Sequence, residues 1–213
     1  MSKLEKYLEQ YWNSKAFRPL QQEIIGHYLS GKDTLVLLPT GGGKSICYQL
    51  PALLKKGQTL VISPLISLMQ DQVDQLNRRG IKSMFFESGR NKNDIFRQLE
   101  NARNGEYKLI YCSPERLTDE EFMSQLKMLS IDGIAIDEAH CISEWGHDFR
   151  PAFKTIKFLR KIRKAQLINE FLRENKVQGI IADHWKSLEL IKTTNKKYCL
   201  IHGKEINHPK GSF

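Results

Sequence analysis

The chain has 213 residues, of which 40% are hydrophobic and 27% are charged, and these proportions are typical of a globular protein. No apolar run approaches the roughly 18 residues that a membrane span needs, and the N-terminal segment is too charged for a signal peptide. We therefore expect a cytoplasmic protein, nucleoid-associated if its source is bacterial, with no membrane partner. The four cysteines form no Cys-x-x-Cys pair, which gives neither a zinc ribbon nor a disulfide framework.

The net charge of +9 is unevenly distributed along the chain. Residues 1–153 contain 19 basic and 19 acidic side chains, so the whole excess lies in the last 60 residues. A basic tail after a neutral body indicates two regions with separate roles. The tail suits either a solvated face or a surface that binds nucleic acid, and composition leaves both alternatives open.

Two helices are expected first, over Leu4–Trp12 and Pro19–Leu29, after which short apolar runs alternate with stretches of helical spacing. The expected strands are Thr34–Leu38, Thr59–Ser63, Ser83–Phe86, Lys108–Cys112 and Ile131–Asp137. The expected helices between and after them are Ile46–Lys56, Leu65–Arg79, Asn91–Asn104, Glu115–Leu129 and Phe153–Lys164. This order predicts an α/β fold with a doubly wound, mostly parallel sheet, covered by helices on both faces.

The pattern is weaker beyond Lys164, where a helix is expected over Gln166–Glu174 and strands over Val177–Ala182 and Tyr198–His202. This segment could add a further strand to the sheet or be partly disordered, and the sequence leaves both alternatives open. We therefore divide the chain into a domain over residues 1–164 and a basic extension of unknown fold over residues 165–213.

A glycine-rich segment, Thr40-Gly41-Gly42-Gly43-Lys44-Ser45, joins the first expected strand to the next helix. Glycines let the backbone N–H groups wrap around an anion, and the helix N-terminus favours the same negative charge. In such a loop Lys44 reaches the β- and γ-phosphates of a nucleotide and the Ser45 hydroxyl ligates Mg²⁺. All six residues are candidates for nucleotide binding.

Two carboxylates, Asp137 and Glu138, follow the last of the five expected strands. Ligands bind at the carboxyl ends of strands in open parallel sheets. Asp137 is a candidate for holding Mg²⁺, and Glu138 is a candidate for taking a proton from an attacking water.

The run Asp137-Glu-Ala-His140, together with the glycine-lysine loop, resembles superfamily 2 helicases. The next segment, Cys141–Pro151 (CISEWGHDFRP), resembles the aromatic-rich loop of RecQ DNA helicases. The resemblance implies a RecA-like lobe of the P-loop NTPase class that uses ATP and Mg²⁺. It also implies that four residues of the loop respond to single-stranded DNA: Trp145, His147, Phe149 and Arg150. Aromatic faces and arginine suit such contacts.

Three further matches occur in the order expected for RecQ helicases. Phe17–Gln21 (FRPLQ) resembles the adenine-recognition element, which implies that Arg18 and Gln21 select ATP. Segments Ser63–Val73 and Tyr111–Leu117 are similar to elements that contact the DNA backbone, which implies phosphate contacts at Ser63 and Ser113. Both serines also suit a simple capping role at the start of a helix.

The resemblance covers about residues 10 to 160 and implies an ATP-dependent 3′-to-5′ DNA helicase, active in DNA repair and recombination on single-stranded or partially duplex DNA. No segment resembles the second motor lobe of such enzymes, so we expect a chain truncated after the first lobe. The missing lobe supplies an arginine to the transferring phosphate, and unwinding and ATP hydrolysis by this chain alone should be slow. The alternative is a non-enzymatic module that binds nucleotide and nucleic acid. The sequence leaves the oligomeric state open.

Overall fold

The computed structural model describes residues 2–31, 34–38, 41–86, 92–139, 180–182 and 199–202. The α-helices are α1 (Lys3–Trp12), α2 (Gln21–Leu29), α3 (Ile46–Leu54), α4 (Ile66–Arg78), α5 (Lys92–Arg103) and α6 (Glu120–Leu126), and Pro114–Thr118 forms a 3-10 helix. The strands are β1 (Thr34–Leu37), β2 (Gln58–Ile62), β3 (Ser83–Phe85), β4 (Leu109–Cys112), β5 (Ile131–Ile136), β6 (Ile180–Ala182) and β7 (Cys199–His202). None of these helices is long and apolar enough to cross a membrane.

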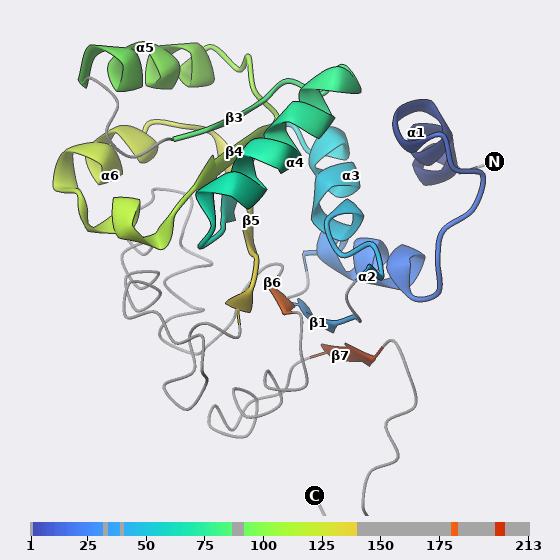
Figure 1. Ribbon diagram of the computed structural model, residues 1–213. Helices are drawn as coiled ribbons and strands as arrows, with labels where there is room; N and C mark the ends of the chain where they lie inside the picture. The colour runs from blue at the N-terminus through green and yellow to red at the C-terminus, as the bar shows by residue number, and fades with distance from the viewer. Residues whose placement is uncertain are drawn as a thin grey trace, which may run out of the picture.

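The described strands form one sheet in the order β3-β4-β2-β5-β6-β1-β7, and every pairing in it is parallel (Figure 1). Strand β2 pairs with β4 and β5, and β1 pairs with β6 and β7. The predicted α/β fold with a parallel sheet is therefore confirmed. Because all pairings are parallel, the carboxyl ends of the strands lie at one edge of the sheet.

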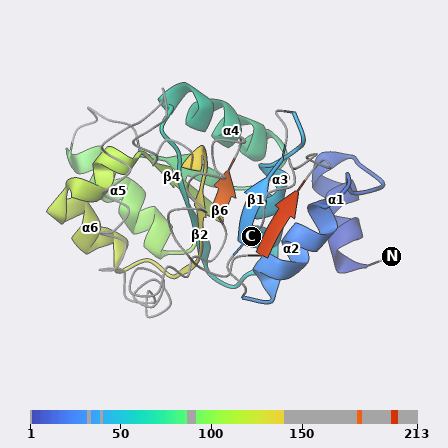
Figure 2. The ribbon, with the colours of Figure 1, turned by 90° about the horizontal axis from the view of Figure 1, so that it is seen from below.

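Consecutive residues of the central strands enter two different hydrophobic clusters. In β2, Leu60 and Ile62 belong to the cluster beneath α5 and α6, whereas Val61 belongs to the cluster beneath α3 and α4. Successive side chains of a strand point to opposite faces, so each strand needs apolar residues throughout. Figure 2 shows α5 and α6 on one side of the strands and α1 and α2 on the other.

Two of the differences between the expected and observed helix boundaries have a clear local cause. Helix α2 begins at Gln21 instead of Pro19, because Leu20 adopts a left-handed backbone with φ of +68°. The single helix expected over Glu115–Leu129 is divided in two at Asp119, which is extended and accepts a hydrogen bond from the Phe122 N–H at 3.1 Å. Aspartate favours this capping geometry over a helix interior, so a new helix begins there.

The basic extension contributes two of the described strands. Strand β6 lies between β5 and β1, and β7 pairs with β1 on its other side. The described residues of this segment are thus strands of the sheet, and its other residues lie outside the described part of the chain. The helices expected over Phe153–Lys164 and Gln166–Glu174 lie outside the described residues.

Gly133 in β5 admits the Tyr28 side chain from α2 into the sheet. A Cβ atom at Gly133 would overlap with the Tyr28 hydroxyl oxygen. That hydroxyl lies 3.4 Å from Thr59 Oγ1 on β2, and Lys55 Nζ lies 4.4 Å from the centre of the Tyr28 ring. Burial raises the pKa of Tyr28 to about 12. The contact joins α2 to the middle of the sheet.

We expect Gly133→Ala to lower the free energy of unfolding by about 3 kcal/mol, since the new methyl group must displace a buried ring. Gly26→Ala is the matched control. Gly26 lies in α2, and no atom lies within 4 Å of the position that an added methyl group would take, so alanine there should stabilise the chain by up to about 1 kcal/mol. Urea unfolding followed by circular dichroism measures both, and equal stability of the two variants would contradict the prediction.

Candidate functional site

The glycine loop connects the end of β1 to the start of α3, as predicted. Gly41 and Gly43 have φ of +76° and +77°, a left-handed region that favours glycine. Ser45 precedes the first residue of α3. The loop therefore approaches the helix N-terminus with a backbone shape that suits an anion.

Arg18 and Gln21 hold the glycine loop from the side of α2. The Gln21 amide accepts a hydrogen bond from the Arg18 N–H at 2.9 Å and donates to the Gly43 carbonyl at 3.1 Å. The Arg18 guanidinium donates to the Gly41 carbonyl. A Cβ atom at Gly43 would clash with Gln21 Nε2, so glycine is required there both for its φ and for this contact. Both predicted adenine-recognition residues thus contact the glycine loop.

Lys44, Asp137 and Glu138 lie near one another at the carboxyl edge of the sheet. Burial lowers the pKa of the half-buried Lys44, and the negative charges of Glu138 and Asp137 act against that shift. The Asp137 N–H donates to the Ile62 carbonyl at 2.8 Å, which extends the pairing of β5 with β2 by one residue. The fold therefore unites two motifs that are separated by more than ninety residues in the sequence.

The turn after β5 has an unusual backbone. Glu138 adopts φ of +51°, a left-handed conformation that is uncommon for a residue with a side chain and costs of order 1 kcal/mol. The Glu138 N–H donates to Asp137 Oδ1 at 3.1 Å. The turn places the two adjacent carboxylates in different environments, because Asp137 is buried and Glu138 is half-buried.

The environment of the Asp137 carboxyl disfavours its ionised form. Burial, followed by repulsion from Glu138, raises its pKa from 3.8 to about 6, while Lys44 acts in the opposite direction. Among the described residues no three histidine, cysteine or acidic side chains are grouped as a metal site. Ser45 and Asp137 offer only oxygen donors, which suit Mg²⁺ that keeps most of its water and phosphate ligands.

A cavity of about 270 Å³ lies beside the loop. Its lining includes Trp12, Ser14, Arg18, Gln21, Gln72 and Arg79. The Arg79 guanidinium lies 5.9 Å from the Trp12 ring centre. The volume is close to the lower end of the range for small-molecule pockets, and its lining combines the predicted adenine-recognition residues with side chains of α1 and α4.

Ser63 and Ser113 follow the adjacent strands β2 and β4. Their side-chain oxygens are buried, with exposed fractions of 1% and 4% for the residues, and neither has a hydrogen-bond partner among the described residues. The structure thus places the two predicted phosphate-contact residues together but beneath the surface.

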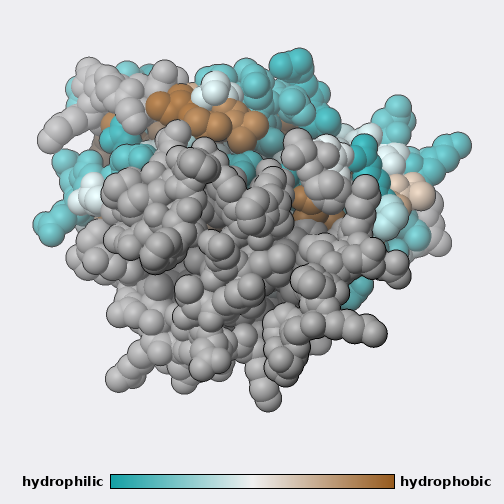
Figure 3. All heavy atoms as spheres, turned by 60° about the horizontal axis from the view of Figure 1, so that its bottom comes forward, coloured by the Kyte–Doolittle hydropathy of each residue, from teal (hydrophilic) through white to brown (hydrophobic). Residues whose placement is uncertain are grey.

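Leu65 and Ile66, which lead from β2 into α4, are 44% and 43% exposed. Figure 3 shows hydrophobic surface as brown patches among hydrophilic residues.

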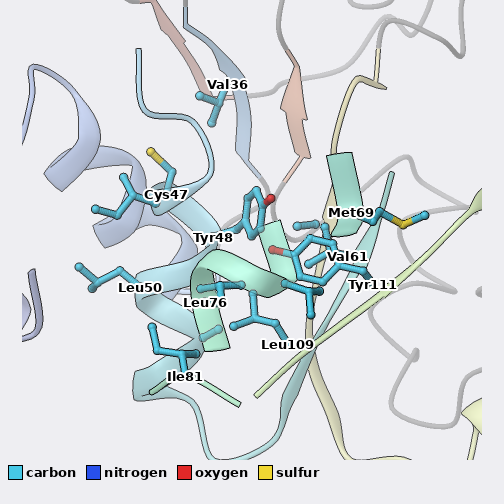
Figure 4. Close-up of a cluster of buried hydrophobic side chains, with 14 of the residues drawn as sticks. Val36, Cys47, Tyr48, Leu50, Val61, Met69, Leu76, Ile81, Leu109 and Tyr111 are labelled. Carbon is cyan, nitrogen blue, oxygen red and sulfur yellow. The ribbon is translucent and has the colours of Figure 1, made fainter. Parts of the chain in front are cut away.

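One polar network at the site was not found from the sequence. Ser45 Oγ accepts a hydrogen bond from Gln72 Nε2, and Gln72 and Tyr111 both accept from Gln49. Figure 4 shows Tyr111 among the apolar side chains of this cluster. The signal in the sequence that could have revealed this network is the helical spacing of Gln72. It follows Met69 by three residues, which indicates a position near the face of the helix that packs on the core.

Five predicted site residues lie outside the described part of the chain: Thr40, Trp145, His147, Phe149 and Arg150. Their roles stay predictions.

Comparisons with known proteins agree with this geometry. The family model described as DEAD/DEAH box helicase matches residues 18–175. The ATP-dependent DNA helicase RecQ of Bacillus subtilis is 46% identical over 160 residues, which are 75% of this chain and 27% of that protein. The probable ATP-dependent DNA helicase RecS of the same organism is 48% identical over 162 residues, 76% of this chain and 32% of that protein.

The fold also resembles solved helicase structures. The crystal structure of the helicase MrfA bound to DNA has a TM-score of 0.67 at 19% identity, covering 94% of this chain and 29% of that chain. At that identity the likeness concerns the fold alone. The sequence comparisons confirm the resemblance to RecQ helicases, and the chain spans about a quarter to a third of the length of the curated relatives named above.

The raised pKa of Asp137 predicts a pH-dependent effect in the chain without metal and nucleotide. Because the folded chain binds this proton more tightly than the unfolded chain, the group stabilises the fold below about pH 4 and loses that contribution as the pH rises through about 6. Asp137→Asn should therefore raise the free energy of unfolding above pH 7 by up to about 3 kcal/mol, with the gap closing toward pH 4.

Urea unfolding of both proteins between pH 4 and pH 8 measures this gap. Asp71→Asn is the control for the substitution itself, because Asp71 is exposed on α4. An Asp137→Asn protein that is less stable than the wild type at pH 8 would contradict the prediction.

Proposed function

This chain belongs to the DEAD/DEAH box helicase family, and we propose that it is an ATP-binding motor lobe of a RecQ-type helicase that unwinds DNA in the 3′-to-5′ direction. One observation carries the proposal. Lys44, which follows the glycine loop, lies near enough to Asp137 and Glu138 for their charges to act on its pKa. A phosphate-binding lysine and two carboxylates at one sheet edge are the parts that phosphoryl transfer requires.

The phosphates of ATP would bind the N–H groups of residues 41–45 at the start of α3. Lys44 supports this role because its ammonium is partly desolvated, which strengthens its attraction for an anion. Arg18 and Gln21 would contact the adenine in the adjoining cavity. The Gln21 amide donates a hydrogen bond to the glycine loop. A change in that amide when the base binds would therefore act directly on the residues that bind the phosphates.

Ser45 and Asp137 would hold Mg²⁺. When bound, this ion supplies positive charge that neutralises the phosphate oxygens. The site fits it, because burial and the charge of Glu138 raise the pKa of the Asp137 carboxyl, and a divalent cation would favour the ionised form of that carboxyl.

Glu138 is the proposed general base. Its backbone N–H donates a hydrogen bond to the Asp137 carboxylate, and its side chain is half-buried. A carboxylate in that position can accept a proton from the water that attacks the terminal phosphate. DNA contacts are proposed for the aromatic-rich loop with Trp145, His147, Phe149 and Arg150. Ser63 and Ser113, whose hydroxyls are buried in this structure, are also proposed to contact DNA phosphates, which requires that DNA binding uncover them.

A second candidate function is a non-enzymatic module that binds nucleotide and nucleic acid. The observation in its favour is that all of the net charge of +9 lies in the last 60 residues. This function requires DNA affinity that falls steeply with salt and does not respond to nucleotide. Titration of labelled single-stranded DNA at several salt concentrations, with and without MgATP, separates it from the motor function.

Lys44→Ala should lower the affinity for MgATP about 100-fold, since the loop loses its only side-chain ammonium and two charge-assisted hydrogen bonds. Fluorescence titration with a labelled ATP analogue measures the change. Lys56→Ala is the control, because Lys56 is exposed and follows α3 at its far end. Unchanged affinity in Lys44→Ala would contradict the proposed nucleotide site.

ATP hydrolysis by this chain, measured with and without single-stranded DNA, should be slow, and Glu138→Gln should lower the rate by at least about 100-fold. Glu138→Gln should still bind MgATP, because the substitution removes a base and no phosphate contact. Glu100→Gln, on the exposed side of α5, is the control. Equal turnover in Glu138→Gln and wild type would exclude Glu138 as the base, and MgATP binding without any turnover in the wild type would favour the second candidate.

A further inference from the structure

A chain of three hydrogen bonds joins the phosphate loop to the protein core. Gln72 Nε2 donates to Ser45 Oγ at 3.0 Å, and Gln49 Nε2 donates to Gln72 Oε1 at 2.5 Å and to Tyr111 Oη at 3.2 Å. We infer that Gln72 is a positioning residue that orients the Ser45 hydroxyl for Mg²⁺. This inference rests on the proposed function, in which Ser45 is a ligand of that ion.

The hydroxyl is the part of Ser45 that still needs orientation. The Ser45 carbonyl accepts hydrogen bonds from the N–H groups of Tyr48 and Gln49 at 3.2 and 2.9 Å, so the first turn of α3 fixes its backbone. A serine hydroxyl otherwise rotates freely and has one proton and two lone pairs. With one lone pair committed to Gln72, the other lone pair is restricted to a narrower set of directions.

The orientation of the Gln72 amide is set by Gln49. Because Gln49 presents an N–H group to Gln72, the oxygen of the Gln72 amide must face Gln49 and its nitrogen must face Ser45. Gln49 in turn is only 3% exposed and is held by the fully buried Tyr111. Core residues therefore determine that Gln72 is the hydrogen-bond donor in its contact with Ser45.

Helix α4 keeps Gln72 in place. Met69, Val73 and Leu76 of the same helix are buried in the cluster that contains Tyr111 (Figure 4). These positions surround Gln72 at helical spacing, so its Cα cannot shift unless the packed helix shifts. Gln72 and Tyr111 lie in the two segments that resemble DNA-backbone elements. A displacement of either residue would reach Ser45 through this chain of hydrogen bonds.

The test compares nucleotide affinity with and without Mg²⁺. A fluorescent, non-hydrolysable ATP analogue is titrated into the full chain in Mg²⁺ and again in excess EDTA. Gln72→Met keeps the length of the side chain and the helix propensity but removes the donor. We expect the ratio of the affinity in Mg²⁺ to the affinity in EDTA to fall about 10-fold, as for other residues that orient a metal ligand. This ratio cancels any effect of the substitution on the cavity beside the loop, which Gln72 also lines.

Gln70→Met is the matched control. Gln70 lies on the same helix and also loses a side-chain hydrogen bond, from Gln70 Nε2 to Asp74 Oδ1 at 2.9 Å, but it does not contact Ser45. Its affinity for the analogue should equal that of the wild type in both conditions. In a Ser45→Ala background, Gln72→Met should change the affinity in Mg²⁺ by less than about twofold, since the group through which it acts is already absent.

The inference is overturned if Gln72→Met binds the analogue like the wild type in Mg²⁺, if it loses the same factor in EDTA, or if the loss persists in Ser45→Ala. Should Gln72→Met unfold, Gln72→Asn retains an amide but is one methylene too short to span from Gln49 to Ser45, and the same Mg²⁺-specific loss is expected. Wild-type protein whose affinity is the same with Mg²⁺ and with EDTA would instead count against the proposed function itself.

Discussion

Parallel pairing of the strands is the constraint on which the site depends. In register, Ile62 of β2 pairs with Ile136 of β5 and with Cys112 of β4, so the residues that follow these strands leave the sheet together. The hydrogen bond from the Asp137 N–H to the Ile62 carbonyl continues the ladder past the last paired residue. A shift of one residue in this register would exchange the two faces of β5 and would move Asp137 and Glu138 relative to Lys44.

The site combines several features that cost stability. Asp137 is buried beside the negative charge of Glu138, Lys44 is partly desolvated, and Glu138 has a left-handed backbone. Such features persist only where the surrounding packing enforces them. The packing here is extensive on both faces of the sheet, where two separate clusters bury nearly every residue of β2, β4 and β5. The proposed nucleotide and its divalent cation would each bring a charge opposite to that of the group it meets, and binding of this kind stabilises the folded chain.

The buried polar chain through Gln72 and Gln49 has the opposite character. Each amide has a partner, and the chain terminates at a core tyrosine, so the cost of burying polar groups is offset by hydrogen bonds. Satisfied buried networks are stiff, because any movement leaves a donor or an acceptor without a partner. Helix α4 and strand β4 are thereby joined to the residue that precedes α3 by polar contacts as well as by apolar packing.

The sequence by itself determined the local chemistry and the order of the elements. The five strands expected in residues 1–164 begin and end within one residue of their expected bounds, and the glycine loop and the Asp137-Glu138 pair occur where the alternating pattern predicted them. These features follow from short-range rules of periodicity and backbone freedom. Tertiary structure alone decided which distant residues meet: Gln21 with the Gly43 carbonyl, Gln72 with Ser45, and Tyr28 with Gly133. It also decided that the hydroxyls of Ser63 and Ser113 are buried and that strands from the basic extension flank β1. The physical reason is that helix packing and strand order depend on contacts between surfaces, which no local pattern of residue types specifies.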